Sequence, residues 1–497
     1  MNFALFVVFC LWTVTRARPP NILLIVADDL GFGDLGFRGA EIKTPTIDEL
    51  ATKGVILEQH YVQPVCTPTR SSLMTGRYPI HNGMQHYVIL LNEPHGVPLD
   101  ETFLPQRLKQ CGYETHAIGK WHLGFYKREY TPCYRGFDTF FGYYQGSEDY
   151  FTHYSGMNIT GWGLDLRRDR RLPNSTVESN LIWNADHVYS AQLFTNEFER
   201  VLSAYDGTRP FFMYLALQSV HAPQEVPQHY VDPYKHISDL NRRRYAGMVA
   251  ALDETVLNVT ATLKKSGVWN DTLVVFTSDN GGPIAGCSDS IGARNCPLRG
   301  GKHSLWEGGI RSNAFVYGAG LDVVGYRNWG LMHVTDWFPT LLHVASEGRD
   351  DGGAELELDG VNQWEMISQN GSSNRREILH NIDPLLTEKI LCGVHHGNHS
   401  ALRVGDYKLL VGDPGPPDSG CQGNSSWHPT SVSHYLFNIK EDPNEEIELS
   451  TKEPEMLTAM LSRMQYYAST AVPPGNKPRD VHANPQYHNG TWVPWDD

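Results

Sequence analysis

The sequence is short of positive charge. It contains 41 Lys and Arg against 56 Asp and Glu, which gives a formal net charge of −15. Proteins that bind nucleic acids generally need a basic surface to neutralise phosphates. The composition therefore argues against a nucleic-acid partner, and any attraction for an anionic substrate must come from a local cluster of cations.

Long apolar runs are also scarce. The run over residues 3–14 is too short to span a bilayer and is typical of a signal peptide, with cleavage near Ala17. No later run is long enough for a transmembrane helix, so we expect no membrane span. We expect residues 1–17 to be a signal peptide and the protein to enter the secretory pathway, as a lysosomal or a secreted protein. Asn-x-Ser/Thr glycosylation sequons support that route at Asn158, Asn174, Asn258, Asn270, Asn370, Asn398, Asn424 and Asn489.

Cysteine is sparse, with eight in 497 residues. Cys10 lies in the expected signal peptide, and the odd number that remains leaves one thiol unpaired in an oxidising compartment. We take Cys66 as that thiol. Closure of short loops then favours these disulfides among the others: Cys287–Cys296, Cys392–Cys421 and, by default, Cys111–Cys133.

The length of 497 residues predicts two domains. Apolar runs typical of strands buried on both faces occur at 21–27, 113–118, 211–217 and 273–278. Helical stretches lie between them, the clearest at about 242–265. This alternation predicts an α/β fold over residues 18–370, with a large sheet sandwiched by helices.

The C-terminal part has a different pattern. We expect a short helix at about 361–368, a domain boundary near 370, and a small α+β domain over residues 371–497. Its elements are short strands at 377–382, 401–404, 407–411 and 434–439 and a helix at 453–467. We expect the tail from Val472, which is rich in proline and aromatic residues, to wrap the surface.

Polar side chains follow each of the four expected strands of the large domain. They are Asp28, Asp29, Lys120, His122, His221, Asp279 and Asn280. Ligands of open α/β sheets bind outside the carboxyl ends of the strands, so these side chains could share one crevice. In an extended segment Lys120 and His122 would point the same way.

Cys66 precedes a sequence typical of a short helix. Pro68 suits a first helical turn, and Gly76 suits the position just past the last turn. Partial positive charge at a helix N-terminus favours an anion there, and Arg70 follows one turn later. This arrangement indicates nucleophilic chemistry on an anionic substrate, although a buried Cys before a capped helix is an equally good reading of the motif alone.

Three carboxylates and one amide oxygen, from Asp28, Asp29, Asp279 and Asn280, would make a site of hard oxygen ligands suited to Ca²⁺ or Mg²⁺. Taken singly, Asp28-Asp29 is more often a helix cap and Asp279-Asn280-Gly281-Gly282 more often a turn. Lys302 lies among glycines, where a long cation can close around an anion. Each cation and each histidine taken alone is more often an ordinary surface or structural residue.

Several stretches together resemble the arylsulfatase family of sulfatases, within the alkaline-phosphatase-like superfamily. Besides residues 66–77, they are residues 104–124, 135–150, 216–221, 245–248, 297–300 and 380–384. The resemblance runs from about Asn21 to the C-terminal helix, and within the family it is greatest to the arylsulfatase B branch, the N-acetylgalactosamine-4-sulfatases. It implies hydrolysis of sulfate esters, of galactosamine 4-sulfate type or of aryl sulfates.

The resemblance also implies roles for residues. Cys66 would be oxidised to formylglycine by the formylglycine-generating enzyme, and its hydrate would join Asp28, Asp29, Asp279 and Asn280 in binding a divalent cation, Ca²⁺ with Mg²⁺ as the alternative. Arg70 would stabilise the hydrate, and His122 would contact its hydroxyl and remove a proton from it. Lys120, His221 and Lys302 would bind the sulfate. The family usually has Ser where this chain has Thr69; because Cys66, Pro68 and Arg70 are intact, we expect the conversion to proceed.

Two other functions are compatible with the pattern. A phosphohydrolase of the same superfamily would use Thr or Ser and two metals, which the Cys-Pro-Arg motif and the single set of metal ligands argue against. A secreted, catalytically silent carbohydrate-binding relative would not need the full set of catalytic residues that this chain has.

Overall fold

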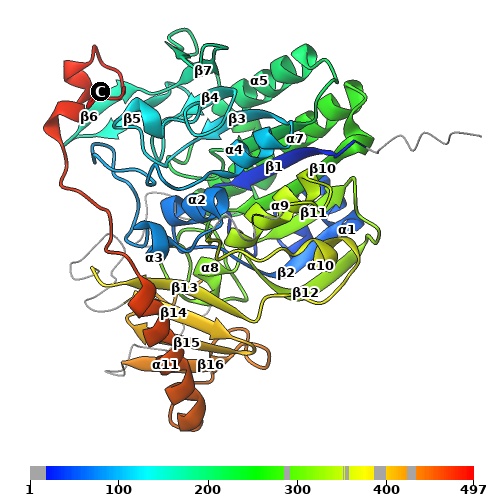
Figure 1. Cartoon of the computed structure of the whole chain (residues 1–497), viewed down its shortest axis with the longest axis vertical. Coiled ribbons are helices and arrows are strands. Elements are labelled where there is room, and N and C mark those ends of the chain that lie inside the picture. The colour runs from blue at the N-terminus through cyan, green and yellow to red at the C-terminus, as the bar shows by residue number, and fades with distance from the viewer. Residues whose placement is uncertain (1–17, 285–291, 351, 353–356, 386–398, 422–432) are drawn as a thin grey trace, which may run out of the picture.

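The computed structural model describes residues 18–284, 292–350, 352, 357–385, 399–421 and 433–497. A large unit with a central sheet occupies one end of the molecule, and a smaller sheet with a long helix occupies the other (Figure 1). The expected signal peptide lies outside the described residues. None of the helices in the described ranges has the length and apolar character needed to cross a bilayer.

The large sheet has ten strands. In spatial order they are β12 (Tyr326–His333), β2 (Val55–Tyr61), β11 (Ala314–Gly318), β10 (Thr272–Ser278), β1 (Asn21–Ala27), β9 (Phe211–Ala216), β3 (Glu114–Lys120), β4 (Thr139–Tyr143), β7 (Arg167–Arg171) and β8 (Val177–Leu181). The five strands from β10 to β4 are parallel, so their carboxyl ends meet at one edge. The four strands expected from the sequence are confirmed as β1, β3, β9 and β10.

Helices cover both faces of this sheet, as the apolar runs predict. Leu23 and Ile25 of β1 point into a core that includes α1 (Pro45–Lys53), α5 (Ser190–Ala204) and α7 (Leu240–Lys265). Leu24 and Val26 point into the opposite core, with α2 (Cys66–Thr75), α4 (Leu104–Gln110), α9 (Trp337–Ala345) and α10 (Trp364–Ser368). The continuous apolar run of β1 is explained because both of its faces are buried.

The smaller sheet is antiparallel and comprises β13 (Glu377–Asp383), β14 (His399–Val404), β15 (Tyr407–Gly412) and β16 (His434–Asn438). Helix α11 (Pro454–Thr470) packs on it through Met460, Met464 and Tyr467. The tail then returns to the large unit and ends near the hairpin of β5 (Tyr154–Met157) and β6 (Gly161–Leu164), where Trp492 is fully buried (Figure 1). The remaining short helices are α3 (Pro79–Asn82), α6 (Gln228–Val231) and α8 (Glu307–Ile310).

The disulfide pattern differs from the sequence prediction. Cys296 is bonded to Cys421, 125 residues away, with a Cα–Cα distance of 6.2 Å. The predicted pairs Cys287–Cys296 and Cys392–Cys421 were therefore wrong, and Cys287 and Cys392 lie outside the described residues. Cys111 and Cys133 are free thiols, so that pair was wrong too. Loop closure favours near neighbours, whereas the fold brings two distant loops together, as the bond from the Asn295 N–H to the Ser419 carbonyl (2.8 Å) also shows.

A buried ion cluster joins the small sheet to helix α8. Lys408 of β15 contacts Glu307 of α8 at 3.0 Å and Glu445 at 2.7 Å, and all three side chains are completely buried. Burial and the nearby Glu307 carboxylate raise the pKa of Glu445 to about 7, despite Lys408. The folded state therefore binds the proton of the Glu445 carboxyl group more tightly than the unfolded chain does.

This cluster gives a prediction for the pH dependence of stability. Because the pKa of Glu445 is raised from 4.5 to about 7 on folding, a cost in stability develops as the pH rises between these values; it is on the order of 1–3 kcal/mol above pH 7 and small near pH 5. Glu445→Gln should therefore melt higher than wild type at pH 8, and the difference should shrink or reverse at pH 5. Thermal melts at both pH values measure this, and an equal difference at the two would contradict the account.

Candidate active site

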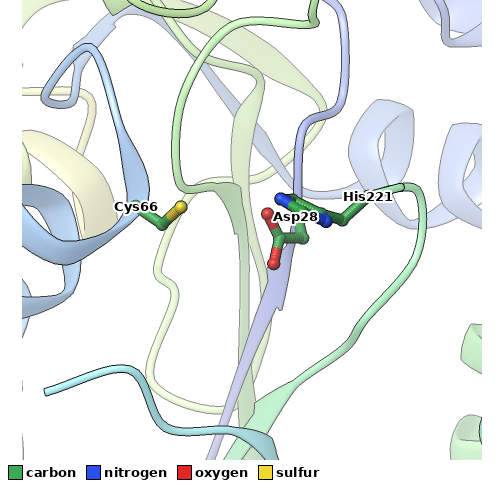
Figure 2. A group of neighbouring side chains, drawn as sticks. All are labelled: Asp28, Cys66 and His221. Atoms are coloured by element: carbon green, nitrogen blue, oxygen red, sulfur yellow. The ribbon is translucent and has the colours of Figure 1, made fainter. Parts of the chain in front are cut away.

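The polar residues at the strand ends converge as the topology predicts. Asp28 and Asp29 follow β1, Asp279 and Asn280 follow β10, and all four are fully buried. Cys66 begins α2 on the other side of the crevice, and His221 follows β9. Figure 2 shows the Cys66 thiol, the Asp28 carboxylate and the His221 ring facing one another. One potential ligand atom from each of these three lies within 4.8 Å of the others.

Helix α2 positions Cys66 and Arg70 as expected. Gly76 ends the helix in the left-handed conformation, with φ of 69°. One turn inside, Arg70 donates to Asp279 Oδ2 at 2.8 Å and to Asp28 Oδ2 at 3.2 Å. Its Nε also donates to Asp279 Oδ2, at 3.1 Å, and its Nη1 donates to the Lys120 carbonyl and the Tyr214 hydroxyl. Arg70 is therefore fixed between the ends of β1 and β10, one helical turn after Cys66.

The thiol of Cys66 is not activated as a thiolate. Burial raises its pKa, and Asp279 and Asp28 add to the rise, against Lys120 and Lys302. The helix N-terminus and the cations do not outweigh these effects. The idea that this position favours an anionic sulfur is thus wrong for the cysteine itself, because the thiol is buried and two carboxylates lie beside it.

Lys120 and Lys302 each bind a different carboxylate. Lys120 Nζ donates to Asp28 Oδ2 at 2.6 Å, and Lys302 Nζ donates to Asp29 Oδ2 at 2.8 Å. Although burial opposes it, Lys120 and Arg70 hold the pKa of Asp28 well below its usual range. Burial and the Asp28 carboxylate raise the pKa of Asp279 to about 6, more than Arg70 lowers it. The cluster thus holds three carboxylates close together.

The donor set fits a hard divalent cation. Oxygen atoms of Asp28, Asp29 and Asp279 lie within 4.8 Å of one another. Asp28 Oδ1 and Asn280 Oδ1 are buried and accept no hydrogen bond from any described residue. Buried acceptor oxygens are normally paired, so these two free acceptors beside three carboxylates match the oxygen ligands that Ca²⁺ and Mg²⁺ prefer.

The two histidines are held in defined tautomers. His122 Nε2 lies 2.9 Å from the Ile89 carbonyl, which can only accept, so Nε2 carries the proton and the buried Nδ1 has a free lone pair. Burial, then Lys120, holds the pKa of His122 well below its usual range. His221 Nδ1 likewise donates to the Ala222 carbonyl at 2.8 Å, and its Nε2 lies 3.7 Å from Asp29 Oδ2. Burial, then Lys302, lowers the pKa of His221 to about 4.

The segment from Lys120 to His122 is not extended. Strand β3 ends at Lys120, and the chain turns through His122, whose φ is 58°. Lys120 points to Asp28, whereas the His122 ring packs against Gly146, where a Cβ would lie 2.6 Å from the ring. The premise of an extended segment is therefore wrong at this point.

Tyr150 and Tyr214 were missed by the sequence analysis. The Tyr150 hydroxyl contacts the carbonyls of Gln218 and His221, at 3.0 and 2.9 Å, and so holds the segment that carries His221. Tyr214 lies in the middle of β9 and contacts Arg70 at 3.3 Å. Neither tyrosine belongs to a strand-end motif: Tyr214 lies inside an apolar run, which gives no signal for a hydroxyl used in the core, and the stretch that contains Tyr150 does not show that its hydroxyl holds the His221 segment.

Thr69 is integrated into the site by its hydroxyl. Its Oγ1 donates to the Asp279 carbonyl at 2.5 Å and accepts from the Gln63 N–H at 2.9 Å. A serine has the same hydroxyl, so Thr69→Ser should leave the melting temperature nearly unchanged. Thr69→Val keeps the shape but leaves the buried Gln63 N–H unpaired, which should cost about 1–3 kcal/mol. Denaturant unfolding of both variants measures the difference, and equal stability of the two would refute this role.

Comparisons with known proteins agree with this geometry. The sulfatase family model matches residues 20–347. Arylsulfatase J of Mus musculus is 44% identical over 96% of this chain and 80% of its own length. Human N-acetylgalactosamine-6-sulfatase is 28% identical over 96% of this chain and 89% of its own. The crystal structure of Ps i-CgsB in complex with k-i-k-neocarrahexaose superposes with a TM-score of 0.73 and 29% identity, covering 92% of this chain and 94% of that one.

The family prediction is thus confirmed, while the specificity of the arylsulfatase B branch stays a prediction. A family model that spans most of the large domain, relatives that cover almost the whole chain, and an α/β sheet with a small C-terminal antiparallel sheet all agree. The chain therefore belongs to the sulfatase family: it is a sulfuric ester hydrolase with an alkaline-phosphatase-like fold.

Proposed function

We propose that this sulfatase acts on sulfated glycosaminoglycans of the galactosamine 4-sulfate type, and on aryl sulfates, through a formylglycine made from Cys66. The observation that carries the proposal is the position of Cys66, at the start of α2 and facing Asp28 and His221. Its thiol is buried and has a raised pKa, so sulfur itself is poorly suited to be the nucleophile.

Oxidation by the formylglycine-generating enzyme, with dioxygen as the oxidant, would turn the carbon that carries the thiol into an aldehyde carbon, and the sulfur would leave. The hydrated aldehyde supplies two hydroxyls on one carbon: one attacks sulfur, and the other lets the sulfate leave as the aldehyde returns. His122 is suited to take the proton of the second hydroxyl, because its Nδ1 is unprotonated and free. Arg70 is fixed beneath the same position.

Asp28, Asp29, Asp279 and Asn280 would hold a divalent cation, with the position of Cys66 completing the set. We propose Ca²⁺, with Mg²⁺ as the alternative, because a cluster of carboxylate and amide oxygens is flexible enough for the larger ion. The bound cation would supply positive charge beside the sulfate oxygens.

The cationic side chains would bind the substrate. Lys120 and Lys302 contact different carboxylates of the cluster, and each can turn a donor toward sulfate oxygens. His221 presents Nε2 to the crevice and is the more exposed of these groups, with 17% of its side chain accessible. Lys302 and His221 are the two candidates to protonate the leaving alcohol; the Lys302 ammonium already carries a proton, whereas His221 would first have to take one up at Nε2.

Competing assays test this proposal. The enzyme should release sulfate from an aryl sulfate at least about 100-fold faster than it releases phosphate from the matching aryl phosphate. A panel of defined sulfated saccharides, scored by released sulfate, should then rank galactosamine 4-sulfate units first. Faster phosphate release would favour the phosphohydrolase, and no release from any substrate would favour the silent carbohydrate-binding protein.

We further propose a lysosomal or secreted location, on the basis of the expected signal peptide and sequons. Asn158 and Asn174 of these sequons are exposed in the structure, as N-glycosylation requires.

A further inference from the structure

A second cavity lies apart from the catalytic cluster, where β2 and β12 at the edge of the large sheet approach the small sheet. Its volume is about 570 Å³, which lies within the range of small-molecule pockets. The walls come from the segment after Asp29, from β2, β12 and β14, and from the residues that follow β16. It shares no lining residue with the proposed sulfate and cation ligands.

The cavity is strongly cationic in an acidic protein. Its lining includes five cations, Arg38, Arg311, Arg327, Arg403 and Lys440, and one carboxylate, Glu58. The whole chain has a net charge of −15, so this is a local reversal of sign. A walled cluster of one sign concentrates the field and raises the local concentration of an oppositely charged ligand.

Glu58 is shared between two of the arginines. Arg38 donates to one of its oxygens at 2.6 Å, and Arg327 pairs with the other. Arg311 reaches only the backbone carbonyl of Glu58, at 2.7 Å. One carboxylate therefore pairs with two of the guanidinium groups, and Arg311 contacts only the main chain of Glu58.

Other carboxylates do not cancel the excess. Arg311 also lies 3.7 Å from Glu307, but Glu307 is already paired with Lys408 at 3.0 Å. Lys440 lies 3.8 Å from Asp406 on the exposed rim, where such pairs are weak. The cavity thus keeps a surplus of positive charge.

Arg38 gives the strongest indication that the cavity binds an anion. Only 8% of its side chain is exposed, and its Nη2 has no hydrogen-bond partner among the described residues. Its guanidinium lies 4.3 Å from the centre of the Phe32 ring. Burial lowers the pKa of Arg38, and Arg311 and Arg327 lower it further, although Glu58 acts in the other direction. A buried arginine in this state is stabilised by an additional anion.

The rim carries an exposed aromatic ring. Trp329 of β12 is 61% accessible and lines the same cavity, as does Arg327, whose side chain is 44% accessible. Large aromatic side chains are normally buried, so an exposed indole beside cations marks a binding surface. A flat ring and arginine forks together suit a sugar ring that carries an anionic group.

From these contacts we propose that this cavity is a second saccharide site, which binds a sulfated sugar unit of a glycan chain outside the catalytic centre. Arg327 and the deeper arginines bind the sulfate, and Trp329 stacks on the sugar ring. The choice of a sulfated ligand rests on the proposed function, whereas the cationic cavity itself does not. Such a site would hold a polymeric substrate while the catalytic centre acts on another unit of it.

The test measures binding directly, using the full-length Cys66→Ala protein so that no turnover occurs. Binding to immobilised chondroitin sulfate is compared with binding by the same protein carrying Trp329→Ala or Arg327→Gln. Each change should weaken binding about tenfold, as expected for loss of one aromatic or arginine anchor. Melting temperatures should stay unchanged, since both side chains are exposed.

Matched controls come from elsewhere in the chain. Trp183 is 59% accessible, and Arg200 is a half-exposed arginine paired with the buried Glu197, so Trp183→Ala and Arg200→Gln should bind like the parent. Equal binding by all variants would overturn the proposal, as would unsulfated chondroitin binding as tightly as the sulfated chain. Turnover of aryl sulfate by the wild-type enzyme is measured separately, so failure of the proposed catalysis is distinguished from failure of this site.

Discussion

Cys66→Ala is expected to lower kcat/KM for an aryl sulfate by about four orders of magnitude or more, because it removes the proposed nucleophile outright. The loss of one sulfur atom from a site that is 3% exposed should cost no more than about 1–2 kcal/mol of stability. Cys66→Ser should also be inactive over many turnovers, since a single hydroxyl cannot release the sulfate again.

The matched control is Cys133→Ala, which removes another buried free thiol. It lies in the core beneath α4 rather than in the crevice, so its activity should equal that of the wild type. Activity of Cys66→Ala above a few per cent of wild type would contradict the role of this residue. A collapse of secretion and of the melting temperature would point to a structural role instead.

Asp279→Asn is expected to abolish binding of the divalent ion and to lower kcat by about three orders of magnitude. The reason is that a metal ion contributes several kcal/mol to the stabilisation of such a transition state. Asp279 is one of three clustered carboxylates and the main partner of Arg70. The change keeps the size of the side chain but removes its charge. Elemental analysis of the purified protein measures the ion, beside kinetics with and without a chelator.

Asp253→Asn is the control for this change. Asp253 is also a buried carboxylate, but it accepts from the Ile47 N–H at 2.8 Å, away from the crevice. The Asp253→Asn variant should be less stable than the wild type but should keep the bound ion and the catalytic rate. Full activity of wild-type enzyme in excess chelator, or an unchanged ion content in Asp279→Asn, would show that the assignment of metal ligands is wrong.

The parts of the fold that depend on local patterning could be predicted from the sequence. The apolar run at Asn21–Ala27 reproduces β1 at both ends, because a strand buried on both faces has no polar positions inside it. Helix α2 begins at Cys66 and ends before Gly76, as the Pro and Gly positions indicate. The convergence of Asp28 and Asp279 follows from the parallel pairing of β1 with β10.

What could not be predicted depends on the tertiary structure. The Cys296–Cys421 bond joins loops from the two sheets, and spacing along the chain contains no information about that approach. The turn at His122 and the hydroxyl contacts of Tyr150 arise from neighbours that are distant in sequence. The raised pKa of Cys66 reflects burial first and then the carboxylates of Asp279 and Asp28, and a reading of the helix alone overestimates the stability of an anion there.

The central claim, that Cys66 is converted to formylglycine, is tested most directly by mass spectrometry of the protein secreted from eukaryotic cells. Trypsin should release the peptide of residues 54–70, which contains Cys66 and ends at Arg70. The account predicts that most of this peptide has exchanged its thiol for an aldehyde, which a carbonyl-specific reagent labels. A peptide that contains only the unmodified thiol, from protein that still hydrolyses aryl sulfates, would contradict it.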